Sequence, residues 1–113
     1  MATKTGRLAE DIASSYLEEQ GYRIIDRNWR NRWCEIDIVA RRGEVTHVVE
    51  VKYRANPDFG SGFDYITGQK LGRLCRAADM YMTGREQPYQ IDVVAVTGKL
   101  ESPDIDVIEN VTA

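Results

Sequence analysis

A carboxylate and a lysine stand two positions apart in one apolar run of this chain. The run is Val48-Val49-Glu50-Val51-Lys52-Tyr53. Because side chains alternate between the faces of a strand, Glu50 and Lys52 point to the same side. A charged pair on a valine-rich strand is costly unless other groups compensate it. The candidates for that compensation are Asp37, on the preceding strand-like run, and a divalent cation.

Asp37 and Glu50 are expected to lie side by side. Residues 34–41 and 45–53 read as strands joined by a turn at Arg42-Gly43, so they should pair antiparallel. A two-residue turn there places Asp37 opposite Val48 and diagonal to Glu50, on the same face, with roughly 5–8 Å between the Cβ atoms. A slip of one residue on each strand keeps the two acids together. Two carboxylates this close repel each other unless a hard cation such as Mg²⁺ lies between them.

A third carboxylate, Glu10, belongs to the first expected helix. Residues 7–20 carry an apolar stripe at helical spacing, and Gly21 ends the helix. Ala13 and Leu17 follow Glu10 by three and seven positions, so Glu10 borders the stripe and can point toward the sheet. It is either an outer carboxylate of a metal site or an edge residue in an ordinary salt bridge.

The elements that must position these residues form an α/β fold. A strand is expected at 22–28, a helix from an N-cap at Thr67 to about 82, a buried strand at 91–96 and a weak one at 105–109. The order αβββαβ predicts one domain, residues 1–113, with a mixed central sheet flanked by helices.

Charge and composition restrict the function classes only partly. The net charge is −3, but residues 23–76 hold 11 Lys/Arg against 7 Asp/Glu, which permits a basic surface inside an acidic protein. No apolar run is long enough to span a membrane, and the N-terminus lacks the apolar stretch of a signal peptide, so we expect a cytoplasmic protein. Cys34 and Cys75 are expected to be reduced core thiols.

Taken together, these motifs resemble the YraN family of predicted endonucleases. That family is similar to archaeal Holliday junction resolvases and to the restriction-endonuclease-like, PD-(D/E)xK superfamily. The resemblance covers about residues 5–97 and rests on these segments: Gly6-Arg-Leu-Ala-Glu10-Asp-Ile-Ala13, Arg27-Asn-Trp-Arg30, Glu35-Ile-Asp37-Ile38, Val49-Glu-Val-Lys-Tyr-Arg54, Lys70-Leu-Gly-Arg-Leu74 and Ile91-Asp-Val-Val94. Ala9 and Cys34 stand where the family usually has glycine.

The resemblance implies a restriction-endonuclease-like fold and a metal-dependent nuclease that acts on DNA, including branched or damaged DNA. It makes Asp37 and Glu50, completed by Glu10, the ligands of Mg²⁺ or Mn²⁺, and Lys52 the catalytic lysine that orients water and stabilises charge. Glu35, on the same face as Asp37, has a secondary role. Relatives that cut symmetric junctions act as dimers, so a homodimer is also expected. Two alternatives are a non-cleaving nucleic-acid-binding module of the same fold and an interaction protein in which the four charged residues form a buried ion network.

Other residues could contact the nucleic acid. Gln69, Arg73 and Arg76 share one face of the second helix, where they bind phosphates or form a solvated basic face. Lys70 lies nearer the apolar stripe, and Arg54 ends the Glu-x-Lys segment. Trp29 and Trp33 could stack on bases or pack on the sheet edge, and we favour packing. The remaining expectations are structural roles for His47 and Asp92, and a substrate-facing loop at 54–66.

Overall fold

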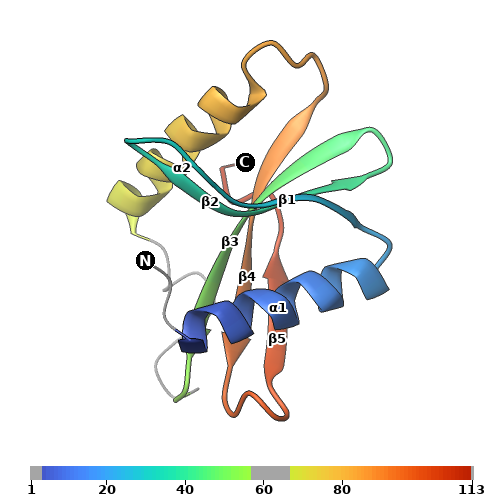
Figure 1. The fold of residues 1–113 in the computed structure, drawn as a ribbon, viewed down its shortest axis with the longest axis vertical. Coiled ribbons are helices and arrows are strands. Elements are labelled where there is room, and N and C mark those ends of the chain that lie inside the picture. The colour runs from blue at the N-terminus through green and yellow to red at the C-terminus, as the bar shows by residue number, and fades with distance from the viewer. Residues whose placement is uncertain (1–3, 57–66, 113) are drawn as a thin grey trace.

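The computed structural model describes residues 4–56 and 67–112, and within them the expected α/β fold is confirmed. The order of the elements along the chain is helix, three strands, helix and two strands (Figure 1). Their bounds are α1 Lys4–Glu19, β1 Arg23–Arg30, β2 Glu35–Arg42, β3 Val45–Arg54, α2 Gly68–Met82, β4 Tyr89–Thr97 and β5 Asp104–Ile108. The expected loop at 54–66 lies largely outside the described residues.

The described strands form one mixed sheet in the order β1-β2-β3-β4-β5. Three of the neighbouring pairs are antiparallel, whereas β3 and β4 are parallel because the chain crosses over through α2 between them. The β3–β4 ladder covers all of β3 except its first residue, from Thr46 opposite Tyr89 to Arg54 opposite Thr97. Glu50 and Lys52 are therefore held on a central strand.

The two helices cover opposite faces of this sheet (Figure 1). Consecutive residues in the middle of β2 and β3 belong to different clusters, because neighbouring side chains of a strand point to opposite faces. Ile38 and Val49 pack with Ala13 and Leu17 of α1, while Val39 and Val48 pack with α2, through a set that includes Leu74, Ala77 and Ala78. Neither described helix has the length and apolar character needed to cross a bilayer.

The turn between β2 and β3 differs from the expected one. Arg42 pairs with Val45, so the turn residues are Gly43 and Glu44, and Gly43 has a φ of 63°. A two-residue hairpin turn favours positive φ, which glycine adopts without a steric penalty. The pairing is consequently displaced by one residue on each strand, and Val39 rather than Asp37 lies opposite Val48.

Candidate functional site

Asp37 lies where β2 separates from β3. The regular pairing ends at Ile38 opposite Val49, and the next positions along the same register are Asp37 and Glu50. Beyond that point the Val51 N–H donates to Asp37 Oδ2 at 2.8 Å. A side-chain carboxylate thus accepts a strand N–H group and holds Asp37 against the strand that carries Glu50.

The environment of Asp37 disfavours its ionised form. Asp37 is 8% exposed, and burial raises the pKa of its carboxyl group. The negative charge of Glu50 raises the pKa further, Glu10 and Glu35 add smaller contributions, and the Val51 N–H opposes them. The pKa reaches about 7. Among the described residues, the groups that favour the charged form of Asp37 are therefore outweighed by burial and by the neighbouring acids.

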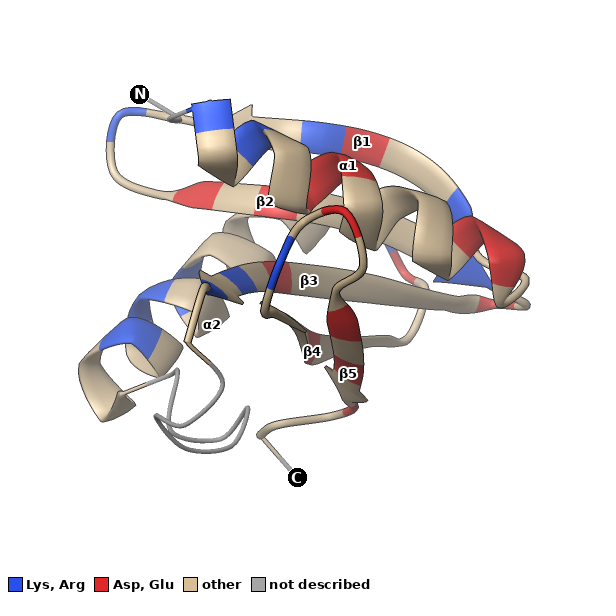
Figure 2. Ribbon diagram, turned by 90° about the horizontal axis from the view of Figure 1, so that it is seen from below, with Lys and Arg blue, Asp and Glu red and all other residues tan. Residues whose placement is uncertain are grey.

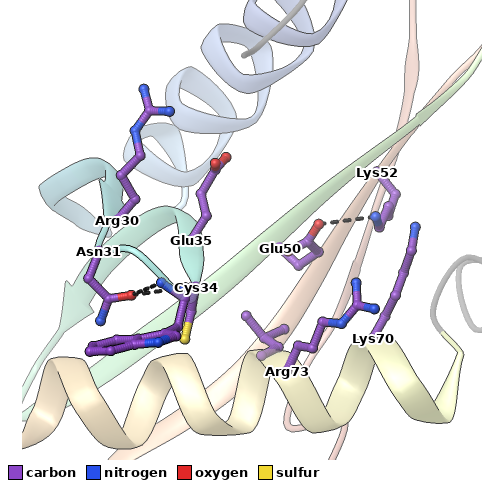
Figure 3. A pocket seen from close by; sticks show the side chains of 10 residues that line it. Arg30, Asn31, Cys34, Glu35, Glu50, Lys52, Lys70 and Arg73 are labelled. Atoms are coloured by element: carbon purple, nitrogen blue, oxygen red, sulfur yellow. Dashed lines mark hydrogen bonds and ion pairs between the residues drawn. The ribbon is translucent and has the colours of Figure 1, made fainter.

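Glu50 and Lys52 project from β3 into a pocket of about 410 Å³ (Figure 3). Lys52 Nζ lies 3.1 Å from Glu50 Oε1, and both side chains are about one-fifth exposed, at 21% and 23%. Glu50 and Lys52 are therefore only partly buried, unlike Glu10 and Asp37, which are 7% and 8% exposed. The charges of the pair face the pocket.

The opposite wall of the pocket comes from α2. Lys70 and Arg73 rise from this helix toward Glu50 and Lys52 (Figure 3). Lys and Arg residues lie along α2, whereas Asp and Glu residues cluster on β5 and on much of α1 (Figure 2). The pocket therefore opens onto the basic side of the protein.

The two lysines influence each other's protonation. Burial alone lowers the pKa of Lys52, but the charge of Glu50 and its hydrogen bond outweigh this effect and the pKa is raised. A hydrogen bond and charge repulsion from Lys52 lower the pKa of Lys70. An anion bound between the two ammonium groups would relieve this repulsion.

Glu10 approaches Asp37 from the α1 side of the sheet. It is 7% exposed, and its Oε1 atom has no hydrogen-bond partner among the described residues. Arg27 lies 4.0 Å from that atom. Burial raises the pKa of Glu10, and the side-chain hydrogen bond with Asn28 and the charge of Arg27 only partly offset it.

Asn28 is a member of this cluster that the sequence alone did not single out for a role. Its φ is 54°, a left-handed conformation that asparagine tolerates better than most residues. Following the β1–β2 register from the Arg27–Ile38 and Trp29–Ile36 pairs, Asn28 lies across from Asp37. The one available signal was its place in the Arg27–Arg30 segment.

The predicted residues are not all gathered in one place. Glu35, Glu50, Lys52, Lys70 and Arg73 line the pocket, whereas Asp37 and Glu10 are buried and are not among its lining residues. Arg76 lines an adjoining pocket, exposed Gln69 lines neither of them, and half-buried Arg54 ends β3 on the face of Glu50.

Within residues 4–56 and 67–112, one trio of possible ligand residues has its ligand atoms within 4.8 Å of one another. It is His47, Asp92 and Glu109, not the three predicted metal carboxylates. His47 Nδ1 and Asp92 Oδ2 are 2.6 Å apart in the core, and Glu109 is bound by Arg42 at 3.2 Å. His47 and Asp92 satisfy each other and Glu109 is paired with Arg42, in agreement with the structural roles expected for His47 and Asp92.

The cysteines and tryptophans only partly follow expectation. Cys34 and Cys75 are free thiols, but both are half-buried rather than in the core. Trp29 packs edge-on against Tyr81, with 5.4 Å between the ring centroids, as predicted. Trp33 is 71% exposed, so the packing role predicted for it is wrong.

Comparison of the chain with known proteins identifies its family. The model of the Uncharacterised protein family UPF0102 matches residues 9–96, which include all four charged residues of the candidate site. The chain belongs to this family. The YraN resemblance is thereby confirmed at the level of the family.

Curated relatives support the same assignment. A UPF0102 protein of Syntrophus aciditrophicus is 40% identical over 110 residues, which cover 95% of this chain and 87% of the relative. A UPF0102 protein of Flavobacterium johnsoniae is 39% identical over 88 residues, covering 78% and 72%. One from Parafrankia sp. is 40% identical over 99 residues, covering 85% and 84%.

In this UPF0102 protein, the donor set around Asp37 suits a hard divalent cation. Carboxylate oxygens are the ligands that Mg²⁺ and Mn²⁺ prefer. Among the described residues, Glu10 Oε1 has no hydrogen-bond partner and only Arg27 at 4.0 Å, and the pKa of Asp37 is raised, so the negative charge of both buried acids is incompletely compensated. The acids at and beside the pocket could hold a metal ion, and the cations that line it could hold a phosphate.

Proposed function

We propose that this UPF0102 protein is a Mg²⁺- or Mn²⁺-dependent nuclease that hydrolyses phosphodiester bonds of DNA, including branched or damaged DNA. The observation that carries the proposal is that acidic and basic side chains line the same pocket. Glu50 lines it together with Lys52, Lys70 and Arg73, and Asp37, just beyond the last pair of the β2–β3 ladder, is close enough for the charge of Glu50 to raise its pKa.

Glu50, Asp37 and Glu10 would hold the metal ion. When bound, such an ion polarises a phosphate oxygen and lowers the pKa of a bound water. A bound cation would favour the ionised forms of Glu10 and Asp37, whose pKa values are raised by burial in its absence. The carboxylates thus respond to the metal rather than forming a permanent ion network.

Lys52 would act on the scissile phosphate. Its pKa is raised, so the ammonium group stays protonated and can donate to a water molecule or to a phosphate oxygen. Its contact with Glu50 fixes the ammonium beside the proposed metal ligands. Preorganised positive charge of this kind stabilises the transition state of phosphoryl transfer.

Lys70 and Arg73 would bind the DNA backbone. Arg73 carries a planar guanidinium group that can donate two parallel hydrogen bonds to a phosphate, while Lys70 acts as a point charge. Arg76 extends the basic surface along α2, and Arg54 and Gln69 flank it at the end of β3 and the start of α2.

A cleavage panel tests this proposal. Linear duplex, nicked, flapped and four-way junction DNA would be incubated with the protein in Mg²⁺, Mn²⁺ or EDTA. Cleavage of at least one substrate is expected with either metal and not in EDTA. Glu50→Gln should reduce the rate by about 100-fold or more, because a metal ligand worth several kcal/mol is removed.

The matched control is Lys99→Gln, which changes an exposed charge near the β4–β5 turn and should leave cleavage unchanged. If the wild-type protein binds these DNAs without cutting any of them in either metal, the nuclease proposal is refuted and the non-cleaving binding module is favoured. If calorimetry shows binding of neither DNA nor a divalent cation, both the nuclease and the non-cleaving binding module are refuted.

A further inference from the structure

A second pocket of about 340 Å³ adjoins the proposed catalytic pocket. Trp33, Cys34 and Arg73 line both, so the two pockets lie next to each other. The second pocket is completed by Arg76 and Met80 of α2. Its lining combines an indole ring, a thiol and a thioether with two guanidinium groups, which is an apolar surface bordered by positive charge.

The loop that carries Trp33 is held in place by its own hydrogen bonds. Asn31 Oδ1 accepts from the backbone N–H groups of Trp33 and Cys34, both at 2.9 Å, and the Asn31 N–H donates to the Cys34 carbonyl at 3.0 Å. Asn31 Nδ2 also contacts Met80 Sδ at 3.2 Å, which ties the loop to α2. These bonds fix the backbone at Trp33 while leaving the indole 71% exposed.

The charges around this ring suit a nucleotide. The Arg32 guanidinium lies 5.4 Å from the centroid of the Trp33 ring, and Arg73 and Arg76 border the pocket. An aromatic face next to arginines is the arrangement that proteins use to stack a base while they bind its phosphates. Bases inside a duplex are stacked on their neighbours and cannot offer a face to such a ring, so the ligand must be unpaired.

We infer that Trp33 is a stacking platform for an unpaired nucleobase, and that the preferred DNA substrate carries an unpaired nucleotide next to the phosphate bound at Glu50 and Lys52. This inference rests on the proposed function for its phosphate, but the base site itself depends only on Trp33 and the arginines. In a branched or damaged DNA, the feature that this protein recognises is therefore a base outside the stack, beside the position of cleavage.

Binding to matched probes tests the inference without requiring cleavage. Three fluorescent DNAs of the same length are compared: a duplex with one unpaired thymidine, the same duplex with an abasic residue at that position, and a fully paired duplex. Anisotropy is measured in EDTA and again with Ca²⁺. The wild-type protein should bind the unpaired-thymidine probe about tenfold more tightly than the abasic probe.

Substitutions at Trp33 then assign the effect. Trp33→Ala should remove the difference between the two probes, whereas Trp33→Phe, which keeps an aromatic face, should retain most of it. Arg76→Gln should weaken binding to all three probes by a similar factor, since it removes a phosphate contact. Because Trp33 is largely exposed, Trp33→Ala should melt within a few degrees of wild type.

Two results would overturn the inference: equal binding of the thymidine and abasic probes by wild type, or an unchanged preference in Trp33→Ala. Either result together with normal metal-dependent cleavage would leave the nuclease proposal standing. A base preference without any cleavage would refute the nuclease and keep the base site. A protein that binds none of the probes would refute both.

Discussion

Asp37→Asn should make the metal-free protein more stable at pH 8. The Asp37 carboxyl has a folded-state pKa of about 7 against an ordinary value of 3.8. An acid whose folded pKa is raised costs stability as it ionises, so wild-type stability should fall as the pH rises from about 4 to about 7 and then stay level with respect to this group. The amide of asparagine does not ionise, and its oxygen can still accept the Val51 N–H.

The magnitude follows from the difference of about three pKa units. At 1.36 kcal/mol per unit, the ionised Asp37 costs roughly 4 kcal/mol of unfolding free energy above pH 7. Asp37→Asn should therefore gain about 2–4 kcal/mol at pH 8, or about 10 °C in Tm for a domain of this size, and almost nothing at pH 4.

Urea unfolding at pH 4, 5, 6, 7 and 8 in EDTA measures this profile. Asp106→Asn is the matched control, because it makes the same chemical change at an exposed carboxylate of β5 and should leave the profile unchanged. Adding Mg²⁺ at pH 8 should stabilise the wild-type protein but not Asp37→Asn. If Asp37→Asn is less stable than wild type at pH 8, or has the same pH profile, the carboxylate is a satisfied structural group and the reasoning fails.

The other substitutions separate metal ligand, phosphate contact and scaffold. Glu10→Gln should lower the cleavage rate by about tenfold or more. The Tm of the metal-free protein, followed by circular dichroism, should stay equal or rise, because the substitution removes a buried, poorly partnered charge. A large loss of Tm would show that Glu10 is a structural residue. Lys70→Gln should weaken DNA binding and reduce the slope of log K against log salt by about 1, which anisotropy titrations at several salt concentrations would check. Asp92→Asn should cost about 3 kcal/mol in urea unfolding, because it disturbs a buried pair with His47, yet leave DNA binding unchanged at low temperature.

Much of the fold was predictable because its elements follow simple periodicities. The apolar stripe of α1, the N-cap at Thr67 and the valine-rich central strands all lie within a few residues of the expected bounds. The strand period of two also places Glu50 and Lys52 on the α2 side of β3, as the pocket that they line confirms. These features depend on local sequence and on burial alone.

The details of the candidate site were less predictable because they depend on departures from regular geometry. The left-handed Asn28 and the end of the β2–β3 ladder at Ile38 bring Asp37 and Glu10 near each other across the edge of the sheet. Neither departure has a strong sequence signal. The exposure of Trp33 likewise depends on the hydrogen bonds of Asn31, which fix a short loop that periodicity cannot describe.

Asp37 and Asp92 differ in how their neighbours compensate the carboxylate, a difference that the sequence alone does not show. Both are aspartates on buried, largely apolar strands. Burial raises the pKa of Asp92 too, but hydrogen bonds from His47, the Asn110 N–H and Gln90 outweigh it, and the pKa is lowered. Asp92 therefore stabilises the fold at every pH above its ordinary value of 3.8, and this contribution is lost only as the pH falls through its lowered folded-state pKa.

The neighbours of Asp37 have the opposite effect and raise its pKa. Its one strand N–H donor is outweighed by burial and by the surrounding carboxylates, so its charge is left uncompensated by the described protein groups. A carboxylate whose charge is compensated by hydrogen bonds from the fold gains little from a metal ion. A carboxylate whose charge is incompletely compensated, like that of Asp37, would be stabilised by a bound cation. This difference in partners, rather than residue type or burial, is what favours Asp37 over Asp92 as a metal ligand.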